Sequence, residues 1–444
     1  MTPQSSFMVL APIDARREAE LNRLLESMNG APGHARPDNA LVPFGQFDGL
    51  HVARFLIVDD RTLADNRAYG IPAPVYPRGL TFLGDVDGDA DDFLVDVSAR
   101  ASHGLRAIFS CCEGFTAETD LLQWMRAHQV PAAAVYVNWQ GRTARQVRED
   151  AALRDALERH VNRLTPEIER LTPRQVHERL RDLVMVDVRA GRLTLSPDAP
   201  TPMGWRIANL LHLASLPAVI LILLLTLLLV PRIALLAVIA VAVLAVVRLR
   251  VLEQTDPELC SRPPAESVAE LALLEDHDVT NQFNAMGTLK PGPLRRWTTM
   301  LVLWVIDWAA RHIYTRGRLA RVRSIHFARW VFLDGRRRVI FLSNYDGSVE
   351  SYMDDFINKV GFGLNLVFGN GIGYPRVRWL LLDGCHDERK FKDYLRRHQM
   401  PTQVWYKAYP GLTAVDLERN ARLRQGLDAS SLSERAAHDW VALL

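Results

Sequence analysis

The two halves of this chain carry the same short sequence blocks in the same order, and this repeat constrains the fold more than any other feature. The first half reads HVARFLIVDDR from His51, and the second reads HFARWVFLDGR from His326, an offset of 326 − 51 = 275. The next block is FLGDVDG from Phe82 and FLSNYDG from Phe341, an offset of 341 − 82 = 259. Two further pairs follow, GLRAIFSCCEGF with GLNLVFGNGIGY and RAHQVP with RRHQMP. Four blocks in one order, separated by small insertions, indicate an internal duplication.

Each copy alternates strand-like and helix-like segments. In the second copy, runs of branched and aromatic residues predict strands, and amphipathic patterns predict helices. The expected strands are 326–334, 337–346, 364–368, 377–383 and 402–409, and the expected helices are 348–360, 388–400 and 413–427. Strand pairs interleaved with helices predict a ferredoxin-like α+β sandwich whose sheet is covered by helices on one face. The uncovered faces of the two copies would then pack together, as a pseudo-dimer or a dimeric α+β barrel.

Residues 207–247 are almost uninterruptedly apolar and contain no acidic residue and no lysine. A helix that spans a membrane needs about 20 apolar residues; residues 210–230 provide them, whereas residues 233–247 lie at the lower limit. Pro231 cannot continue the helical hydrogen bonds, and Arg232 would be costly at the centre of a bilayer. These features predict a transmembrane helical hairpin. A single long bent helix and a buried helix pair in a soluble core are the alternatives.

Arginines set the expected orientation of the hairpin. Arg206 precedes the first helix, Arg248 and Arg250 follow the second, and Arg232 lies at the turn. The positive-inside rule therefore predicts that both soluble lobes face the cytoplasm from the inner membrane, as a pseudo-dimer of the two copies requires. The start MTPQSSFMVLAPID lacks the basic and long apolar parts of a cleavable signal peptide.

These observations divide the chain into five expected regions. They are a first ferredoxin-like copy at 1–163, a helical connector at 164–204, the hairpin at 205–252, a polar segment with an amphipathic helix at 253–322, and a second copy at 323–444.

A second apolar stretch, 294–323, is interrupted by Asp307 and Arg311. Its tryptophans Trp297, Trp304 and Trp308 have arginines on both sides, which is typical of a helix that lies at the level of the lipid headgroups. An amphipathic helix that packs on its own domain explains the same pattern.

Composition excludes several classes of protein. The formal net charge is 53 − 51 = +2, whereas a nucleic-acid binder usually carries a large basic excess. Four cysteines without a CxxC pair do not form a disulfide framework or a typical zinc site. The chain also lacks a Walker loop, a GxGxxG, a GxSxG and an HExxH sequence.

The H-x-A-R motif opens a strand in both copies. Alternation along a strand would place His326 and Arg329 on opposite faces of the sheet, unless the strand is bulged. One interpretation makes His326 a ligand or general acid–base and Arg329 an anion clamp. The other is structural, with Arg329 bound to the Asp-Gly turn and His326 closing the sheet.

The second repeated motif is a strand end that reads GDVDG, with Asp87, in the first copy and SNYDG, with Asn344 and Asp346, in the second. Asp-Gly suits a turn before a helix, and Ser348 can cap that helix. GDVDG also fits the GxxDG pattern of dye-decolorizing haem peroxidases, which have two ferredoxin-like halves, and the chain resembles that family in these two respects. The resemblance implies a haem with His326 as the proximal metal ligand, and with Asp87 and Arg54 as the distal acid and charge stabiliser.

The third candidate region is the polar segment 274–295, for which the sequence shows no counterpart ahead of the first copy. Only five of the 53 basic residues are lysines, and Lys290 is the first of them. A compact ammonium near the membrane suits a phosphate or carboxylate group, or a proton transfer, and the amides of Asn281, Gln282 and Asn344 are candidate substrate-binding groups. The alternative is a polar linker with a turn. VTNQF and LKPG, followed by IHFARW, FLSNYDGS and PTQVWYKAYP, resemble a bacterial family of uncharacterised membrane-associated proteins, which implies no particular activity.

Two functions remain from these observations. The first is a membrane-anchored enzyme that acts on a lipid or other apolar substrate, with a haem-dependent, peroxidase-like oxidoreductase as one form of it. Its site would be lined by six residues from the motifs above, Asn281, Gln282, Lys290, His326, Arg329 and Asp346. The second is a non-catalytic, membrane-associated ligand-binding or scaffold protein. The implied partners are membrane lipids and, as one option, a second copy in a homo-oligomer; two hydrophobic helices disfavour a transporter.

Overall fold

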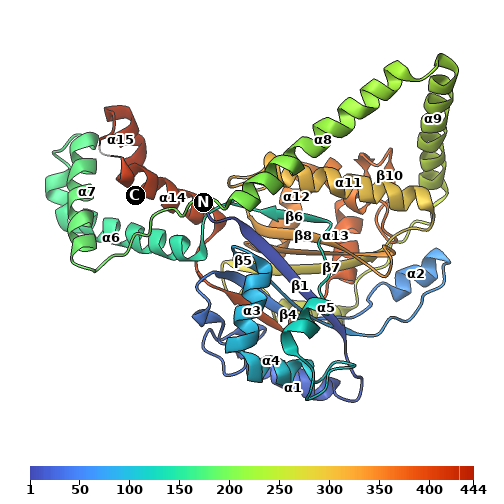
Figure 1. Ribbon diagram of the computed structural model, residues 1–444, viewed down its shortest axis with the longest axis horizontal. Helices are drawn as coiled ribbons and strands as arrows, with labels where there is room; N and C mark the ends of the chain where they lie inside the picture. Colours follow the sequence, from blue (N-terminus) through green and yellow to red (C-terminus); the bar gives the residue numbers. More distant parts are fainter. Residues whose placement is uncertain (430) are drawn as a thin grey trace.

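The computed structural model describes residues 1–429 and 431–444, apart from the side chains of 165–167. It is a mixed α+β structure in which two larger sheets lie side by side, with helices on their outer sides (Figure 1). The first sheet has the strand order β1 (Gln4–Pro12), β5 (Gly79–Asp87), β4 (Leu50–Val58), β12 (Val404–Lys407), β3 (His34–Ala35) and β2 (Asn29–Ala31). The second has the order β6 (Ala134–Val137), β8 (Ile325–Leu333), β9 (Arg338–Asp346) and β7 (Thr280–Thr288).

The two halves of the chain exchange their last strands. Strand β12, near the C-terminus, pairs with β4 of the first half, with Val404 opposite Phe55. Strand β6, from the first half, pairs with β8 of the second, with Ala134 opposite Trp330. Each sheet is therefore completed by a strand from the other half. The expected region 1–163 ends between segments that pair in the same sheets, so it does not contain a complete sheet.

Strand β7 takes the place in the second sheet that β1 takes in the first. The β1–β5 pairing runs from Gln4 opposite Asp87, and the β7–β9 pairing runs from Thr280 opposite Asp346. The expectation that residues 274–295 have no counterpart ahead of the first copy is therefore wrong. Asparagine and glycine are depleted in strands, so the segment TNQFNAMGT does not look like a strand in sequence.

Apolar side chains fill the space between the sheets. One cluster combines Met8, Leu56 and Leu83 of the first sheet with Val331 and Ile340 of the second. The outer face of the first sheet packs on α1 (Glu18–Ser27), α3 (Ala90–Arg100), α4 (Ser102–Phe109) and α5 (Leu121–Ala127). The outer face of the second packs on α11 (Pro293–His312), α12 (Val349–Phe368) and α13 (Glu388–His398).

Two of the expected strands are wrong. Residues 364–368 continue α12, whose backbone kinks at Val360, and Leu364 and Val367 lie on its buried face. Residues 377–383 form a small separate hairpin of β10 (Val377–Arg378) and β11 (Leu382–Asp383). Short apolar runs fit a buried helix as well as a strand, and here the preceding helix extends through the first of them. The cap at Ser348 is confirmed, because its side chain accepts a hydrogen bond from the backbone N–H of Ser351.

A helical lobe projects from one end of the sheets and contains the C-terminus (Figure 1). It consists of α6 (Ala144–Ile168), α7 (Pro173–Arg189), α14 (Ala414–Asp428) and α15 (Glu434–Val441). Leu153, Leu180, Leu423 and Trp440 form its core. The remaining helices are α2 (Leu63–Tyr69), α10 (Ala265–Ala272) and two short 3-10 turns, η1 (Phe44–Gln46) and η2 (Gly384–His386).

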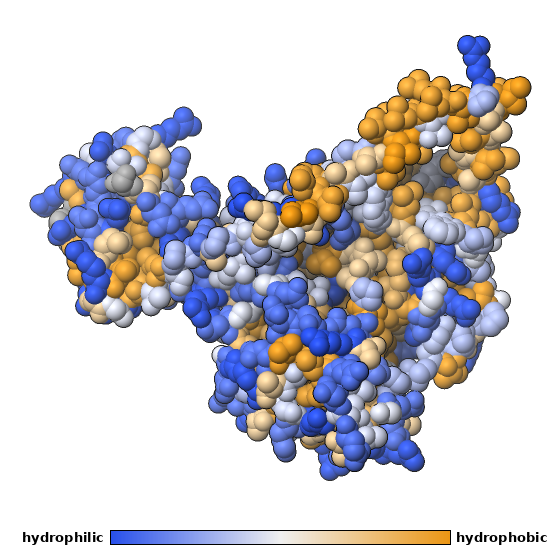
Figure 2. All heavy atoms as spheres, in the orientation of Figure 1, coloured by the Kyte–Doolittle hydropathy of each residue, from blue (hydrophilic) through white to orange (hydrophobic). Residues whose placement is uncertain are grey.

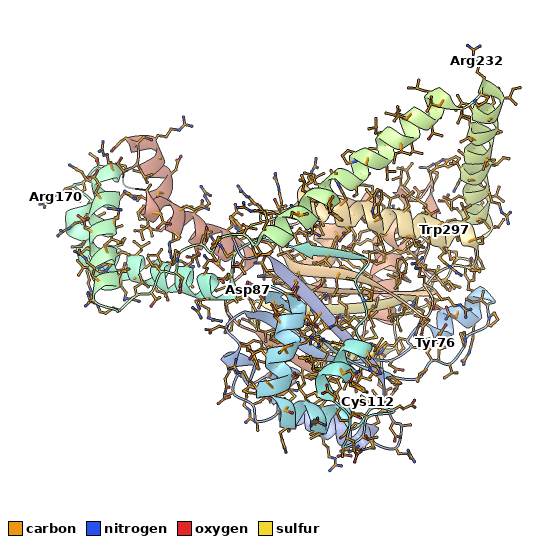
Figure 3. The ribbon with its side chains drawn as sticks, viewed as in Figure 1. Tyr76, Asp87, Cys112, Arg170, Arg232 and Trp297 are labelled. Atoms are coloured by element: carbon orange, nitrogen blue, oxygen red, sulfur yellow. The ribbon has the colours of Figure 1, made fainter. Side chains whose placement is uncertain are left out.

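Helices α8 (Met203–Leu229) and α9 (Arg232–Thr255) are long and apolar enough to cross a membrane. No residue of their most apolar stretches is buried, as residues of a helix pair in a soluble core would be. They are two separate helices that meet at Pro231 and diverge from there (Figure 1), and their side chains form a broad apolar surface (Figure 2). In Figure 3, Arg232 points away from the protein at the tip of the pair.

Helix α11 connects the bases of α8 and α9. At its end, the indole N–H of Trp308 donates to the carbonyl of Leu213 on α8 at 3.0 Å. At its start, Arg295 binds Asp256, directly after α9. Leu303 packs toward the second sheet, whereas Trp297 remains 65 % exposed beneath α9 (Figure 3). The helix therefore packs on its own domain and also presents an apolar face toward the base of the hairpin.

Candidate functional site

The H-x-A-R motif lies at a β-bulge in both halves. The pairing of β4 with β5 shifts register at His51, and that of β8 with β9 shifts at His326. A bulge inserts one residue and interrupts the alternation of side chains. His51 and His326 therefore line the same small cavity as Phe327, between the sheets. The simple alternation that placed His326 and Arg329 on opposite faces is wrong, because the strand is bulged.

Each histidine binds the aspartate of the repeated Asp-Gly motif. Nε2 of His326 lies 2.6 Å from Oδ1 of Asp346, and Nε2 of His51 lies 2.9 Å from Oδ1 of Asp87. Gly88 and Gly347 both adopt positive φ, of 79° and 82°, as the turn after each aspartate requires.

The second oxygen of each aspartate holds the start of a helix. Oδ2 of Asp346 accepts a hydrogen bond from the N–H of Ala414, and Oδ2 of Asp87 accepts one from Ala144, at 2.7 and 2.9 Å. A carboxylate is stabilised at the N-terminus of a helix. Burial raises the pKa of Asp346, but the hydrogen bonds and the charge of His326 outweigh burial, so that this pKa is lowered overall. The repeated His and Asp thus fasten α6 and α14 to the two sheets.

Lys407 and Thr280, which were not expected at a site from the sequence, extend the His326–Asp346 pair, and Tyr409 extends the His51–Asp87 pair. Nζ of Lys407 donates to Oγ1 of Thr280 at 2.6 Å, and Thr280 donates to Oδ1 of Asp346 at 2.7 Å. Tyr409 lies 3.1 Å from Nδ1 of His51. The blocks RAHQVP and RRHQMP align His128 with His398, an offset of 398 − 128 = 270, and at 407 − 270 = 137 the first half has Val137. Lys407 is one of only five lysines, so lysine scarcity combined with the repeat could have found it.

The resulting chain Lys407–Thr280–Asp346–His326 is closed to substrates. Burial lowers the pKa of Lys407, which suits proton transfer. However, the side chains of His326 and Thr280 are 2 % and 1 % exposed. The cavity beside the two histidines measures about 20 Å³, which is room for about one water molecule.

The repeated arginines cross from one sheet to the other. Arg329 donates to the carbonyls of Phe7 and Gly84 at 2.8 and 3.1 Å, and lies 2.6 Å from Oδ2 of Asp85. Among the described residues, no contact joins Arg329 to the Asp-Gly turn of its own half, so the structural interpretation of the motif is wrong on this point. The contact to Asp85 instead ties the second half to the first.

Arg54 makes the equivalent crossing. It donates to Oδ1 of Asn284 at 2.6 Å, to the carbonyl of Ser343 at 3.2 Å, and to the side chain of Asn344. Asn344 stands where the first half has Asp85, so Arg54 binds a neutral amide where Arg329 binds a carboxylate. Burial, together with the charge of Arg329, lowers the pKa of Arg54 to about 9. The side-chain oxygen of Asn344, expected to bind a substrate, thus accepts a hydrogen bond from Arg54.

The residues expected at a haem do not fit that group. Nε2 of His326 is bonded to Asp346, Asp87 is bonded to His51, and Arg54 binds the opposite sheet. The small cavity beside His326 cannot hold a porphyrin. No catalytic step through haem follows from these positions.

Lys290 belongs to a separate cluster at the base of α9. Its Nζ donates to the carbonyl of Gly369 at 3.0 Å and lies 3.1 Å from Oδ2 of Asp256. Asp256 also binds Arg295 at 2.7 Å and accepts the hydroxyl of Tyr69 at 2.6 Å. Burial lowers the pKa of Lys290. Lys290 therefore anchors the end of α9 to the soluble domain.

Asn281 and Gln282 make local contacts. The amide of Asn281 donates to Asp276 and to the carbonyl of Gly347, at 2.7 and 2.9 Å. Gln282 donates to the carbonyl of Leu274 at 3.4 Å. The six residues expected to line one site thus fall into three groups: the His326–Asp346 pair with the adjoining start of β7, the crossing arginines, and the cluster at Lys290.

An open hollow of about 670 Å³ lies beside the end of α9, between β10, β11 and the start of α13. We call it the α9 hollow. Its charged lining includes Arg250, Arg376, Arg378, Glu258, Asp383 and Asp387. Its volume is in the range of small-molecule sites, which is about 300–1,000 Å³. It combines accessible polar groups with a position at the base of the hairpin.

Comparison with known proteins gave no match, whether to protein-family models, to curated proteins or to solved structures.

Proposed function

We propose that this protein is a membrane-anchored, non-catalytic lipid-binding protein, and that the α9 hollow is its binding site. The position of the hollow carries the proposal: accessible charged groups lie directly beside the end of a helix that is long and apolar enough to cross a membrane. Polar groups at that level meet lipid headgroups, which carry phosphate that arginine binds well.

The hairpin of β10 and β11 supports this placement. Trp379, Leu381 and Leu382 at and beside its tip are exposed, and the guanidinium of Arg250 lies 5.7 Å from the Trp379 ring. Tryptophan with leucine beside arginine is typical of the membrane–water interface. The apolar face of α11, with Trp297, continues this surface.

Burial of the repeated motifs supports binding over catalysis. An enzyme acting through His326 would require a substrate to reach a side chain that is 2 % exposed and bonded to Asp346. Arg329 and Lys290 likewise donate hydrogen bonds to backbone carbonyls of the protein itself. The lipid-directed enzyme foreseen from the sequence therefore has weaker support than the lipid-binding alternative.

We also propose that the fold arose by duplication and that both soluble parts lie on the same side of the membrane. The matching strand pairings of β1 with β5 and β7 with β9 support two ferredoxin-like copies that form a pseudo-dimer. The bases of α8 and α9 both attach to α11, so both soluble parts lie on one side of the membrane. The arginines at those bases favour the cytoplasmic side of the inner membrane.

The test is the binding of a fluorescent phospholipid to the full-length protein in detergent. Arg376→Ala with Arg378→Ala removes cations that face the hollow, and Arg389→Ala, an exposed residue of α13, is the matched control. A charged hydrogen bond contributes about 1.5–3 kcal/mol, so the double variant should bind at least about tenfold more weakly. Lipid around α8 and α9 is common to all samples. Equal affinity of wild type, double variant and control would refute the proposal.

A further inference from the structure

The α9 hollow has a positive side and a negative side. The positive side consists of Arg250, at the end of α9, and Arg376 and Arg378 on and beside β10. The negative side includes Glu258, shortly after the end of α9, and Asp387, directly before α13, which Lys390 joins. The lining of the hollow therefore presents both charges to a bound molecule.

On the positive side, one guanidinium keeps its charge uncompensated. Arg250 pairs with Glu253 at 2.9 Å, and Arg378 pairs with Asp383 at 3.3 Å. Arg376 donates to the backbone carbonyl of Asp256 at 3.1 Å and, within the described part of the chain, has no carboxylate partner. The carboxylate of Asp256 is already bound by Lys290 and Arg295. Arg376 is therefore available to an anion.

On the negative side, the carboxylates outnumber their cations. Lys390 lies 2.8 Å from both Glu258 and Asp387, so one ammonium serves two carboxylates. Lys392 is likewise shared, between Glu388 and Asp354. An added cation would complete these pairs, whereas a second anion would be repelled.

We infer that the α9 hollow recognises a zwitterionic phosphoamine headgroup, with the phosphate at Arg376 and a primary ammonium at Glu258 and Asp387. This inference rests on the proposed lipid-binding function and specifies its ligand. An –NH₃⁺ group donates up to three hydrogen bonds to carboxylates, whereas a quaternary ammonium donates none and prefers an aromatic cage. An anionic glycerol headgroup would satisfy Arg376 and leave the negative side unmatched.

Backbone hydrogen bonds from the tip of the β10–β11 hairpin hold the α9 hollow against the end of α9. Trp379 and Leu380 adopt φ of 58° and 55°, in the left-handed region that residues other than glycine rarely occupy. Their N–H groups donate to Glu253 of α9, at 2.9 and 2.7 Å. The tip is thus held to the end of α9, with the Trp379 side chain exposed, so a headgroup in the hollow keeps its acyl chains beside α9.

The experiment measures displacement of a fluorescent phosphatidylethanolamine from the full-length protein in detergent. The competitors are phosphatidylethanolamine, phosphatidylcholine and phosphatidylglycerol with identical acyl chains, together with soluble glycerophosphoethanolamine. We expect phosphatidylethanolamine to compete at least tenfold better than the other two lipids. Weaker competition by the soluble compound indicates that the acyl chains contribute, and equal competition would assign the site to a free phosphoamine.

Two variants separate the two sides of the hollow. Arg376→Gln should weaken all three lipids alike, because all contain phosphate. Glu258→Gln should abolish the preference for ethanolamine over glycerol, and Glu434→Gln, on α15 outside the hollow, is its control. Wild-type preference for phosphatidylglycerol or phosphatidylcholine would overturn the headgroup assignment and leave lipid binding intact. Failure of the protein to bind the labelled lipid or any competitor would overturn the proposed function itself.

Discussion

Asp85 forms an ion pair with Arg329, and its charge also acts on the neighbouring Arg54, so its removal should be severely destabilising. Asp85 and Arg329 are each 3 % exposed in their side chains, with 2.6 Å between Oδ2 and Nη2. Breaking a buried ion pair by removing one partner costs about 3–5 kcal/mol, because the remaining charge is left uncompensated. In Asp85→Asn, the guanidinium groups of Arg329 and Arg54 would both remain buried without a carboxylate.

The repeated sequence block supplies a rescue. Asn344 corresponds to Asp85 at an offset of 344 − 85 = 259, and its side-chain oxygen already accepts a hydrogen bond from Arg54. Asn344→Asp would turn this hydrogen bond to a neutral amide into an ion pair between opposite charges. We expect Asn344→Asp alone to stabilise the protein slightly, and the double variant Asp85→Asn with Asn344→Asp to recover most of the loss.

The assay is thermal unfolding of the purified protein in detergent, followed by tryptophan fluorescence. For a domain of 150–250 residues, 1 kcal/mol shifts Tm by about 2–4 °C, so a loss of about 3–5 kcal/mol should lower Tm by roughly 6–20 °C. Asp96→Asn, which removes an exposed pair with Arg100, is the control and should hardly change Tm. A Tm of Asp85→Asn close to that of this control, or a further fall in Tm when Asn344→Asp is added, would refute the role of Asp85.

Three further predictions concern the other clusters. The first is that Tm of Asp346→Asn should depend less on acidic pH than Tm of wild type. The lowered pKa of Asp346 stabilises the folded wild type fully above the unfolded pKa of 3.8, and this stabilisation is lost as pH falls through the folded pKa. Equal slopes of Tm against pH between pH 2 and 6 would contradict the role of His326. Lys290→Met should lower Tm by more than Lys359→Met, because Lys290 is buried against Asp256 whereas Lys359 makes an exposed pair; similar shifts would show that Lys290 anchors nothing. Haemin added to wild type and to His326→Ala should give the same absorption spectrum, and a Soret shift that requires His326 would restore the haem interpretation.

Elements with a strong local pattern were predictable from the sequence. The branched and aromatic runs at 326–334 and 337–346 became β8 and β9, and the apolar stretch divided at Pro231 became α8 and α9. In these segments, local preference and burial agree. Strand β7 was missed because its pairing with β9, rather than its composition, makes it a strand.

The candidate site was harder to predict because its contacts cross between the halves. The repeat drew attention to His326, Arg329 and Asp346, but their partners depend on a bulge and on the packing of two sheets. Arg329 binds Asp85, which is 329 − 85 = 244 positions away. In both halves the residues of the motif make contacts within the protein itself. The α9 hollow, by contrast, lies outside the repeat motifs and is assembled from α9, β10 and α13.

The exchange of the short strands has a consequence for biosynthesis. The edge of β4 that receives β12 is complete at Val58, but its partner ends at Lys407, 407 − 58 = 349 residues later. At about 5–20 residues per second, translation of that interval takes roughly 17–70 seconds. An open strand edge can pair with other chains, so the nascent N-terminal half needs protection during that time. Helices α8 and α9 leave the ribosome within the same interval, and the chain can therefore reach the membrane before either sheet is closed.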